Sequence, residues 1–102
     1  MSRMTCYKLS DIAEQDISEI YDYTRTHHGY EQAVHYLTGL DPCFNSLIER
    51  PEIGRERPEI RDSLRSIIYK HHVVFYRLHA DYIRIVRVLH ESRDMPRFLQ
   101  DV

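Results

Sequence analysis

The sequence contains little cysteine and no long apolar run. Its two cysteines, Cys6 and Cys43, lie far apart among the 102 residues and fit no metal-ligand spacing. We therefore expect two reduced, buried thiols, and neither a disulfide framework nor a metal or cofactor site. No stretch approaches the length needed to span a bilayer, and no signal peptide is visible. These features predict a cytoplasmic protein that does not enter membranes.

Lysine is scarce among the cationic residues. Twelve of the fourteen cationic side chains are arginine and only two are lysine. Arginine presents a planar fork of donors, which favours directional binding of carboxylates or phosphates. Residues 1–49 carry eight acidic and three basic side chains, a net charge of −5, whereas residues 50–102 carry eight acidic and eleven basic ones, a net charge of +3. The basic second half is therefore the better candidate for a binding surface.

Glycine and proline are also few, at three and four residues, and the chain has no repeats, linkers or low-complexity segments. These features predict one domain over residues 1–102. The hydrophobic patterns predict a strand at 4–9, a helix at about 12–26, a second helix from near residue 30 to Pro51, and strands at about 64–69, 72–78 and 82–90. The expected fold class is α+β. An N-terminal strand and a two-helix hairpin precede three antiparallel strands, which form a small sheet packed on the helices.

Local signals define the two helices. Ser10 and Asp11 are natural caps for the first helix, and Gly29 is suited to end it. Pro42 interrupts the second helix, because proline inside a helix removes a backbone hydrogen bond and costs about 3 kcal/mol. The apolar stripe nevertheless keeps its phase across this proline. We therefore expect a kink near Thr38 rather than a break into two helices.

The strand at 72–78 has apolar residues on both faces. Alternation places Val73 and Phe75 on one face and Val74 and Tyr76 on the other. The helices alone cannot cover both faces. We therefore expect part of the second face to meet another chain.

Arginines of the connector between the second helix and the sheet form one candidate binding site. They either gather into a single cationic patch or remain solvated and pair with nearby carboxylates, and the sequence leaves both interpretations open. These residues are Arg55, Arg57, Arg61 and Arg65.

Three residues of the strands form a second group of candidates. Arg77 and Arg87 lie on neighbouring antiparallel strands and can share a face of the sheet. A strand arginine needs a partner, because an unpaired buried charge is costly. His90 ends the last strand, where an imidazole can either act as an acid or base or simply hydrogen-bond to its neighbours.

Short motifs follow one another in a fixed order along nearly the whole chain. The first half contains Leu9-Ser10, Ala13, Asp16-Ile17, Ile20, Gly29, Gln32-Ala33 and Tyr36-Leu37. The second half contains Pro51, Gly54-Arg55, Arg61, Leu64-Arg65-Ser66, the runs 72–77 and 85–90, and Arg93-Asp94. Together they resemble the RelE/ParE superfamily of toxins from bacterial type II toxin–antitoxin modules, and specifically its ParE branch.

The resemblance implies two activities within the superfamily. The RelE-like and YoeB-like members resemble ribonucleases that cut messenger RNA on the ribosome, and they carry a basic residue one place after the position of His72. This chain has Val73 there, although His90 falls where some nucleases keep a base. The ParE branch is instead similar to inhibitors of DNA gyrase that catalyse no reaction. The resemblance therefore implies a gyrase inhibitor without catalytic residues, neutralised by a ParD-like antitoxin whose C-terminal segment wraps around the toxin.

Two alternatives remain open. One is a ribosome-dependent messenger RNA endonuclease that uses Arg87 and His90, and the other is a non-toxic member that only binds its antitoxin. Direct DNA binding is expected only through the antitoxin complex. The residues expected to contact a partner are Arg55, Arg57, Arg61, Arg65, Tyr76, Arg77, Arg87 and His90.

Overall fold

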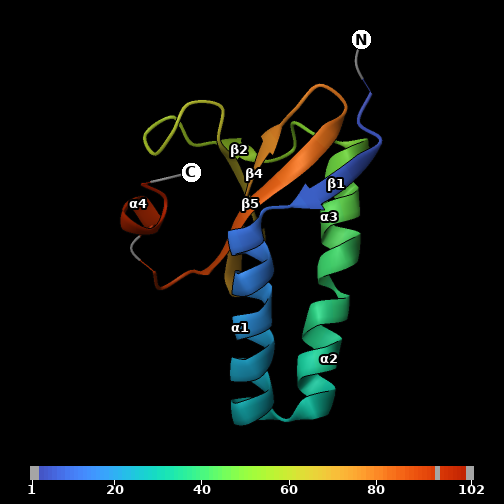
Figure 1. Cartoon of the computed structure of the whole chain (residues 1–102), viewed down its shortest axis with the longest axis vertical. Coiled ribbons are helices and arrows are strands. Elements are labelled where there is room, and N and C mark those ends of the chain that lie inside the picture. Colours follow the sequence, from blue (N-terminus) through green and yellow to red (C-terminus); the bar gives the residue numbers. More distant parts are fainter. Residues whose placement is uncertain (1–2, 94, 101–102) are drawn as a thin grey trace.

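The computed structural model describes residues 3–93 and 95–100. A five-stranded sheet lies at one end of a long helical hairpin (Figure 1), and this architecture confirms the expected α+β class. Along the chain the elements are β1 Cys6–Leu9, α1 Asp11–His28, α2 Tyr30–Thr38, α3 Leu40–Glu49, β2 Arg55–Glu56, β3 Arg65–Tyr69, β4 His72–Leu78, β5 Tyr82–His90 and α4 Met95–Phe98.

The sheet has the strand order β1-β5-β4-β3-β2, with β1 parallel to β5 and the other pairs antiparallel. The bounds of β4 and β5 match those predicted from their apolar patterns. The two-residue strand β2 and the short helix α4 were not predicted, because neither is long enough to show a periodicity. The β4–β5 ladder contains a bulge, because Phe75 pairs with Arg87 whereas the next residue, Tyr76, pairs with Ile85.

Residues suited to helix ends define the bounds of α1. The Ser10 hydroxyl accepts a hydrogen bond from the Ala13 N–H at 3.0 Å, as expected of an N-cap. At the other end Gly29 has φ 92° and ψ 165°, a backbone conformation that glycine adopts readily. The helix buries the face formed by Ala13, Asp16, Ile20 and Thr24.

The second helix was predicted to kink near Thr38 without a break. The position was right, but the prediction of an unbroken helix was wrong. The chain divides at Gly39 into α2 and α3, which follow one another along the hairpin (Figure 1). Pro42 has no N–H to donate to the carbonyl of Thr38, so the hydrogen-bond ladder is interrupted at that turn. A Cβ atom at Gly39 would collide with the Tyr69 hydroxyl of β3. Glycine at this position therefore lets the hairpin approach the sheet closely.

Two apolar cores lie on opposite faces of the sheet. The first joins the helices to the sheet and includes Phe44 and Leu47 of α3. The second core contains Phe75 and Leu89 of the sheet, together with Leu99 from the C-terminal segment, and each of these three side chains is at least 96% buried. The helices are thus not the only cover of the sheet, as predicted. The cover over this part of the second face is the chain's own C-terminal segment, however, so another chain is not needed there.

Within the described residues, no helix is long and apolar enough to cross a membrane. The described part of the chain also contains no group of three histidine, cysteine or acidic side chains that could hold a metal ion. Cys6 and Cys43 are free thiols and half-buried. Asp94, which completes the Arg93-Asp94 motif, lies outside the described residues.

Candidate functional site

A groove of about 1270 Å³ lies between α1 and the C-terminal half of β5. Residues of α1 line one side, from Ile12 near its start to His28 at its end. The opposite side comes from the end of β5, the start of β4 and the stretch that follows β5 as far as Phe98. The groove is therefore built from segments that are far apart in the sequence.

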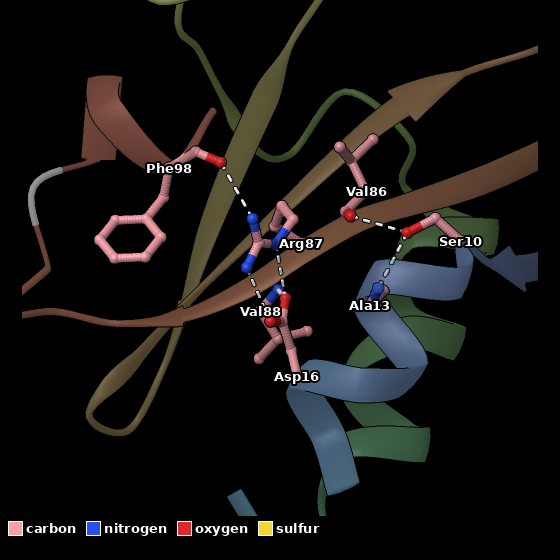
Figure 2. Close-up of polar contacts among 7 residues, drawn as sticks. All are labelled: Ser10, Ala13, Asp16, Val86, Arg87, Val88 and Phe98. Carbon is pink, nitrogen blue, oxygen red and sulfur yellow. Dashed lines mark hydrogen bonds and ion pairs between the residues drawn. The ribbon is translucent and has the colours of Figure 1, made fainter. Parts of the chain in front are cut away.

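A buried ion pair connects the two sides of this groove (Figure 2). Arg87 donates from Nε to Asp16 Oδ2 and from Nη2 to Asp16 Oδ1, both at 2.8 Å. Its Nη1 donates to the carbonyl oxygen of Phe98 at 2.9 Å. The hydrogen bonds and charge of Asp16 raise the pKa of Arg87, which therefore stays protonated. Arg87 thus holds α1, β5 and the C-terminal segment together.

Side chains at the start of α1 form hydrogen bonds with backbone groups of β5, in the part of this strand that β1 does not reach. Asp16 Oδ2 accepts the N–H of Val88 at 3.0 Å, and the Ser10 hydroxyl donates to the carbonyl of Val86 at 2.8 Å (Figure 2). Buried backbone groups are costly when they lack a partner. The Ser10 cap and Asp16 of α1 therefore replace a neighbouring strand at this edge of β5.

Tyrosine and histidine side chains meet where α2 approaches the β3–β4 turn. The Tyr36 hydroxyl and His72 Nδ1 are 2.5 Å apart, and the Tyr69 hydroxyl donates to the Tyr36 carbonyl at 2.7 Å. Burial, together with the neighbouring His90 and His71, lowers the pKa of His72 to about 4. A neutral His72 can accept a hydrogen bond from the Tyr36 hydroxyl at Nδ1, so this contact ties the helical hairpin to the sheet at neutral pH.

His90 and Arg93 line the groove at the end of β5. His90 Nδ1 accepts the Ser92 N–H at 3.1 Å and lies 2.8 Å from the Ser92 hydroxyl. In the neutral ring this contact leaves the proton on Nε2. The guanidinium of Arg93 lies over the Phe98 ring, 4.9 Å from its centroid. Both side chains are exposed, so both can be reached by a partner.

The connector arginines divide between the two interpretations left open by the sequence. Arg57 pairs with Glu59 at 2.7 Å, and Arg65 pairs with Glu56 at 3.4 Å while donating to the Gly54 carbonyl at 2.9 Å. The remaining two, Arg55 and Arg61, are exposed. Half of the proposed patch is therefore engaged within the chain, and half faces solvent.

Tyr76 does not fit the expectation that it contacts a partner. Its side chain is fully buried. Its hydroxyl accepts the Gly54 N–H and donates to the Pro51 carbonyl, both at 2.8 Å. Tyr76 instead fixes the connector against the sheet. Arg77 is half-buried on β4, and strand alternation with the β4–β5 register places it on the same face as Arg87, as expected.

Residues 7–95 match the family described as the ParE toxin of type II toxin–antitoxin system, parDE. The chain belongs to this ParE toxin family. A ParE1 toxin of Mycobacterium tuberculosis strain H37Rv is 37% identical over 94 residues, which cover 91% of this chain and 96% of that protein. A ParE1 toxin of Caulobacter vibrioides is 35% identical over 89 residues, which cover 87% of this chain and 92% of that protein.

The fold also matches a solved structure titled as the chromosomal ParDE TA system from P. aeruginosa. The TM-score is 0.74 over 85% of this chain and 95% of that chain, at 20% sequence identity. This likeness supports the fold assignment.

Sequence reasoning missed part of this ParE-family groove. Asp16 was noticed only as one residue of the family pattern, although it lies in phase with the apolar positions Ala13 and Ile20 of its helix. A carboxylate in a buried helix face requires a partner, and that signal pointed to a strand arginine. Arg93 was likewise not singled out as a site residue. Its contact with the Phe98 ring is a tertiary contact that no local pattern reveals.

Proposed function

We propose that the protein is the toxin of a type II toxin–antitoxin module, that it inhibits DNA gyrase without catalysing a reaction, and that a ParD-like antitoxin neutralises it. The observation that carries this proposal is the match to the ParE toxin family over residues 7–95, nearly the whole chain. The two named ParE1 toxins support it at 37% and 35% identity. The expected location is the cytoplasm, where gyrase and newly made antitoxin are present.

Side chains near the start of β4 support inhibition over RNA cleavage. The superfamily nucleases are expected to carry a basic residue at the position of Val73, and here that side chain packs against the second core. The neighbouring His72 is half-buried and hydrogen-bonded to Tyr36. Arg87, a nuclease candidate, already uses all three of its donor nitrogens within the chain. Catalysis on a phosphate would need a cation free to stabilise the developing charge.

The groove and the exposed arginines suit an antitoxin segment that folds as it binds. Ile12 and Tyr23 of α1 line the groove and are 45% and 61% exposed, so they offer apolar surface to a partner. Arg55 and Arg61 offer positive charge outside the groove. An acidic, amphipathic segment can use both kinds of surface. Arg77, Arg87 and His90 stay predicted partner contacts, with Arg87 already committed to Asp16.

A purified-gyrase assay tests the proposed target. The protein is added to DNA gyrase and supercoiled or relaxed plasmid, with and without ATP, and a detergent step reveals trapped cleavage. Accumulating linear DNA, or supercoiling lost at stoichiometric protein, is expected. Adding purified antitoxin before the toxin should restore supercoiling. Gyrase that remains fully active would contradict the proposal.

One observation favours messenger RNA cleavage as the second candidate function. His90 is exposed in the groove and lies near Arg93, so an imidazole and a guanidinium face the same space. The test is a ribosome-bound messenger RNA incubated with the wild-type protein and with His90→Ala. Cleavage that disappears in the variant would establish the nuclease. Intact RNA together with active gyrase would instead leave a non-toxic, antitoxin-binding member of the family.

A further inference from the structure

The groove offers hydrogen-bond donors on its sheet side that bind no carboxylate within the described part of the chain. On the side formed by α1, Asp16 is engaged by Arg87, and Glu19 also lines the groove. On the opposite side, Arg93 contacts the Phe98 ring. Within residues 3–93 and 95–100, no carboxylate forms an ion pair with it. A guanidinium without a carboxylate partner on the rim of a groove can form a charge-assisted hydrogen bond with a ligand.

His90 presents a second donor to the same groove. Its Nδ1 is occupied as an acceptor by the Ser92 N–H. The neutral ring therefore carries its proton on Nε2, and Nε2 has no partner among the described residues. Two donors separated by three positions of the chain thus line one groove, and neither has a hydrogen-bond acceptor among the residues that the structure describes.

The size of the groove and two exposed apolar residues in its lining indicate a polypeptide rather than a small molecule. A volume of about 1270 Å³ exceeds the range of about 300–1,000 Å³ that is usual for small-molecule pockets. Ile12 and Tyr23 lie along α1, about three helical turns apart, and both are exposed. A segment with apolar side chains at helical or extended spacing can cover both residues at once.

We propose that one carboxylate side chain of the antitoxin docks against Arg93 and His90 Nε2, while apolar side chains of the same segment pack on Ile12 and Tyr23. The inference rests on the proposed function, because it assumes that an antitoxin is the occupant. It adds the chemistry of the contact: an acidic residue at the sheet side of the groove fixes the register of an amphipathic segment. Glu19, on the opposite side, repels a carboxylate placed there and so reinforces that register.

Binding of the antitoxin to toxin variants tests this contact. The antitoxin is produced as the full protein, and as a set of variants in which each Asp or Glu of its C-terminal half is replaced singly by Asn or Gln. Arg93→Gln and His90→Phe are measured against Arg97→Gln, an exposed arginine of α4 that does not line the groove. All three replaced residues are exposed, so circular dichroism and thermal melts should confirm unchanged folding.

The expected result is a loss of affinity of about ten-fold or more for Arg93→Gln, a smaller loss for His90→Phe and less than two-fold for Arg97→Gln. One antitoxin carboxylate should also show coupling. Once it is replaced by an amide, Arg93→Gln should cost nothing further. Equal affinities for all three toxin variants, or losses that no antitoxin carboxylate shares, would overturn this inference while leaving the proposed function standing. Absence of any binding by the wild-type toxin would overturn both.

Discussion

Asp16 and Arg87 lie 71 positions apart in the sequence and share two hydrogen bonds of 2.8 Å. The carboxylate belongs to α1 and the guanidinium to β5, and their side chains are only 7% and 14% exposed. The pair also involves the backbone, because Asp16 accepts the Val88 N–H and Arg87 donates to the Phe98 carbonyl. One ion pair therefore fixes a helix, a strand and the C-terminal segment relative to one another.

Replacing Asp16 by asparagine should destabilise the protein by about 2–4 kcal/mol, because Arg87 is left as a largely buried charge without its counter-ion. The free energy of unfolding in urea measures this loss. Asp22→Asn is the matched control, since Asp22 is an exposed carboxylate of the same helix. Stabilities within 0.5 kcal/mol of wild type, roughly the scatter of surface substitutions, would show that the pair contributes little.

The pair also changes how Arg87 is tested as a partner contact. Arg87→Ala removes the same internal bonds, so weaker partner binding would not by itself demonstrate contact. Arg55→Ala and Arg61→Ala are cleaner probes of the connector surface, because both side chains are exposed.

The sequence predicted most of the fold because its signals are local. β4 and β5 are rich in β-branched and aromatic residues over seven and nine positions, and their predicted bounds were correct. Ser10 capped α1 as its type and position suggested. The local patterns did not predict features that depend on tertiary contacts. The apolar stripe keeps its phase across Pro42, yet the helix divides at Gly39, where the hairpin packs closely on Tyr69 of β3. The cover of the second core likewise comes from Leu99 of the C-terminal segment.

The candidate site was predicted less well, for the same reason. His90 was expected to reach solvent because it ends the last strand, and it is exposed and lines the groove. Tyr76 looked equally available from strand alternation, yet the connector folds over it and its hydroxyl binds Gly54. Such long-range hydrogen bonds set the direction in which the connector turns. The residue pattern within the connector does not predict them.

Replacing Gly39 by alanine should lower stability by about 1–3 kcal/mol, because the new Cβ would overlap the Tyr69 hydroxyl and force the helix and sheet apart. The free energy of unfolding of the single variant is compared with that of Gly39→Ala/Tyr69→Phe. Removing the hydroxyl should recover part of the loss, although Tyr69→Phe also removes the bond to the Tyr36 carbonyl. Strictly additive losses in the double variant would show that the close approach is not the cause.

Truncating Leu99 to alanine should cost about 2–4 kcal/mol, because the side chain is fully buried in the second core and its removal leaves a cavity. Thermal and urea unfolding measure the loss. Gln100→Ala is the neighbouring control, since Gln100 is exposed. A small effect of Leu99→Ala would mean that the C-terminal segment does not contribute to the core in solution.

Acidification should destabilise the protein through His72. Its pKa is lowered from 6.5 to about 4 in the folded state, mainly by burial. Between these two values the unfolded chain binds a proton that the folded chain does not, so the contribution is fully present above pH 6.5 and is lost as the pH falls towards 4. Because His72 is only half-buried, we discount the loss for solvent screening to about 1–2 kcal/mol.

Urea unfolding of wild type and His72→Gln at a series of pH values between 7 and 4 measures that contribution. The variant cannot titrate at this position, so its stability should decrease less over the interval. Titration of other groups is common to both proteins and cancels in the difference. At neutral pH the variant should already be less stable, because the contact between Tyr36 and His72 Nδ1 is lost. Parallel curves for the two proteins would mean that His72 binds its proton equally in the folded and unfolded states, and hence that burial against Tyr36 does not hold it neutral.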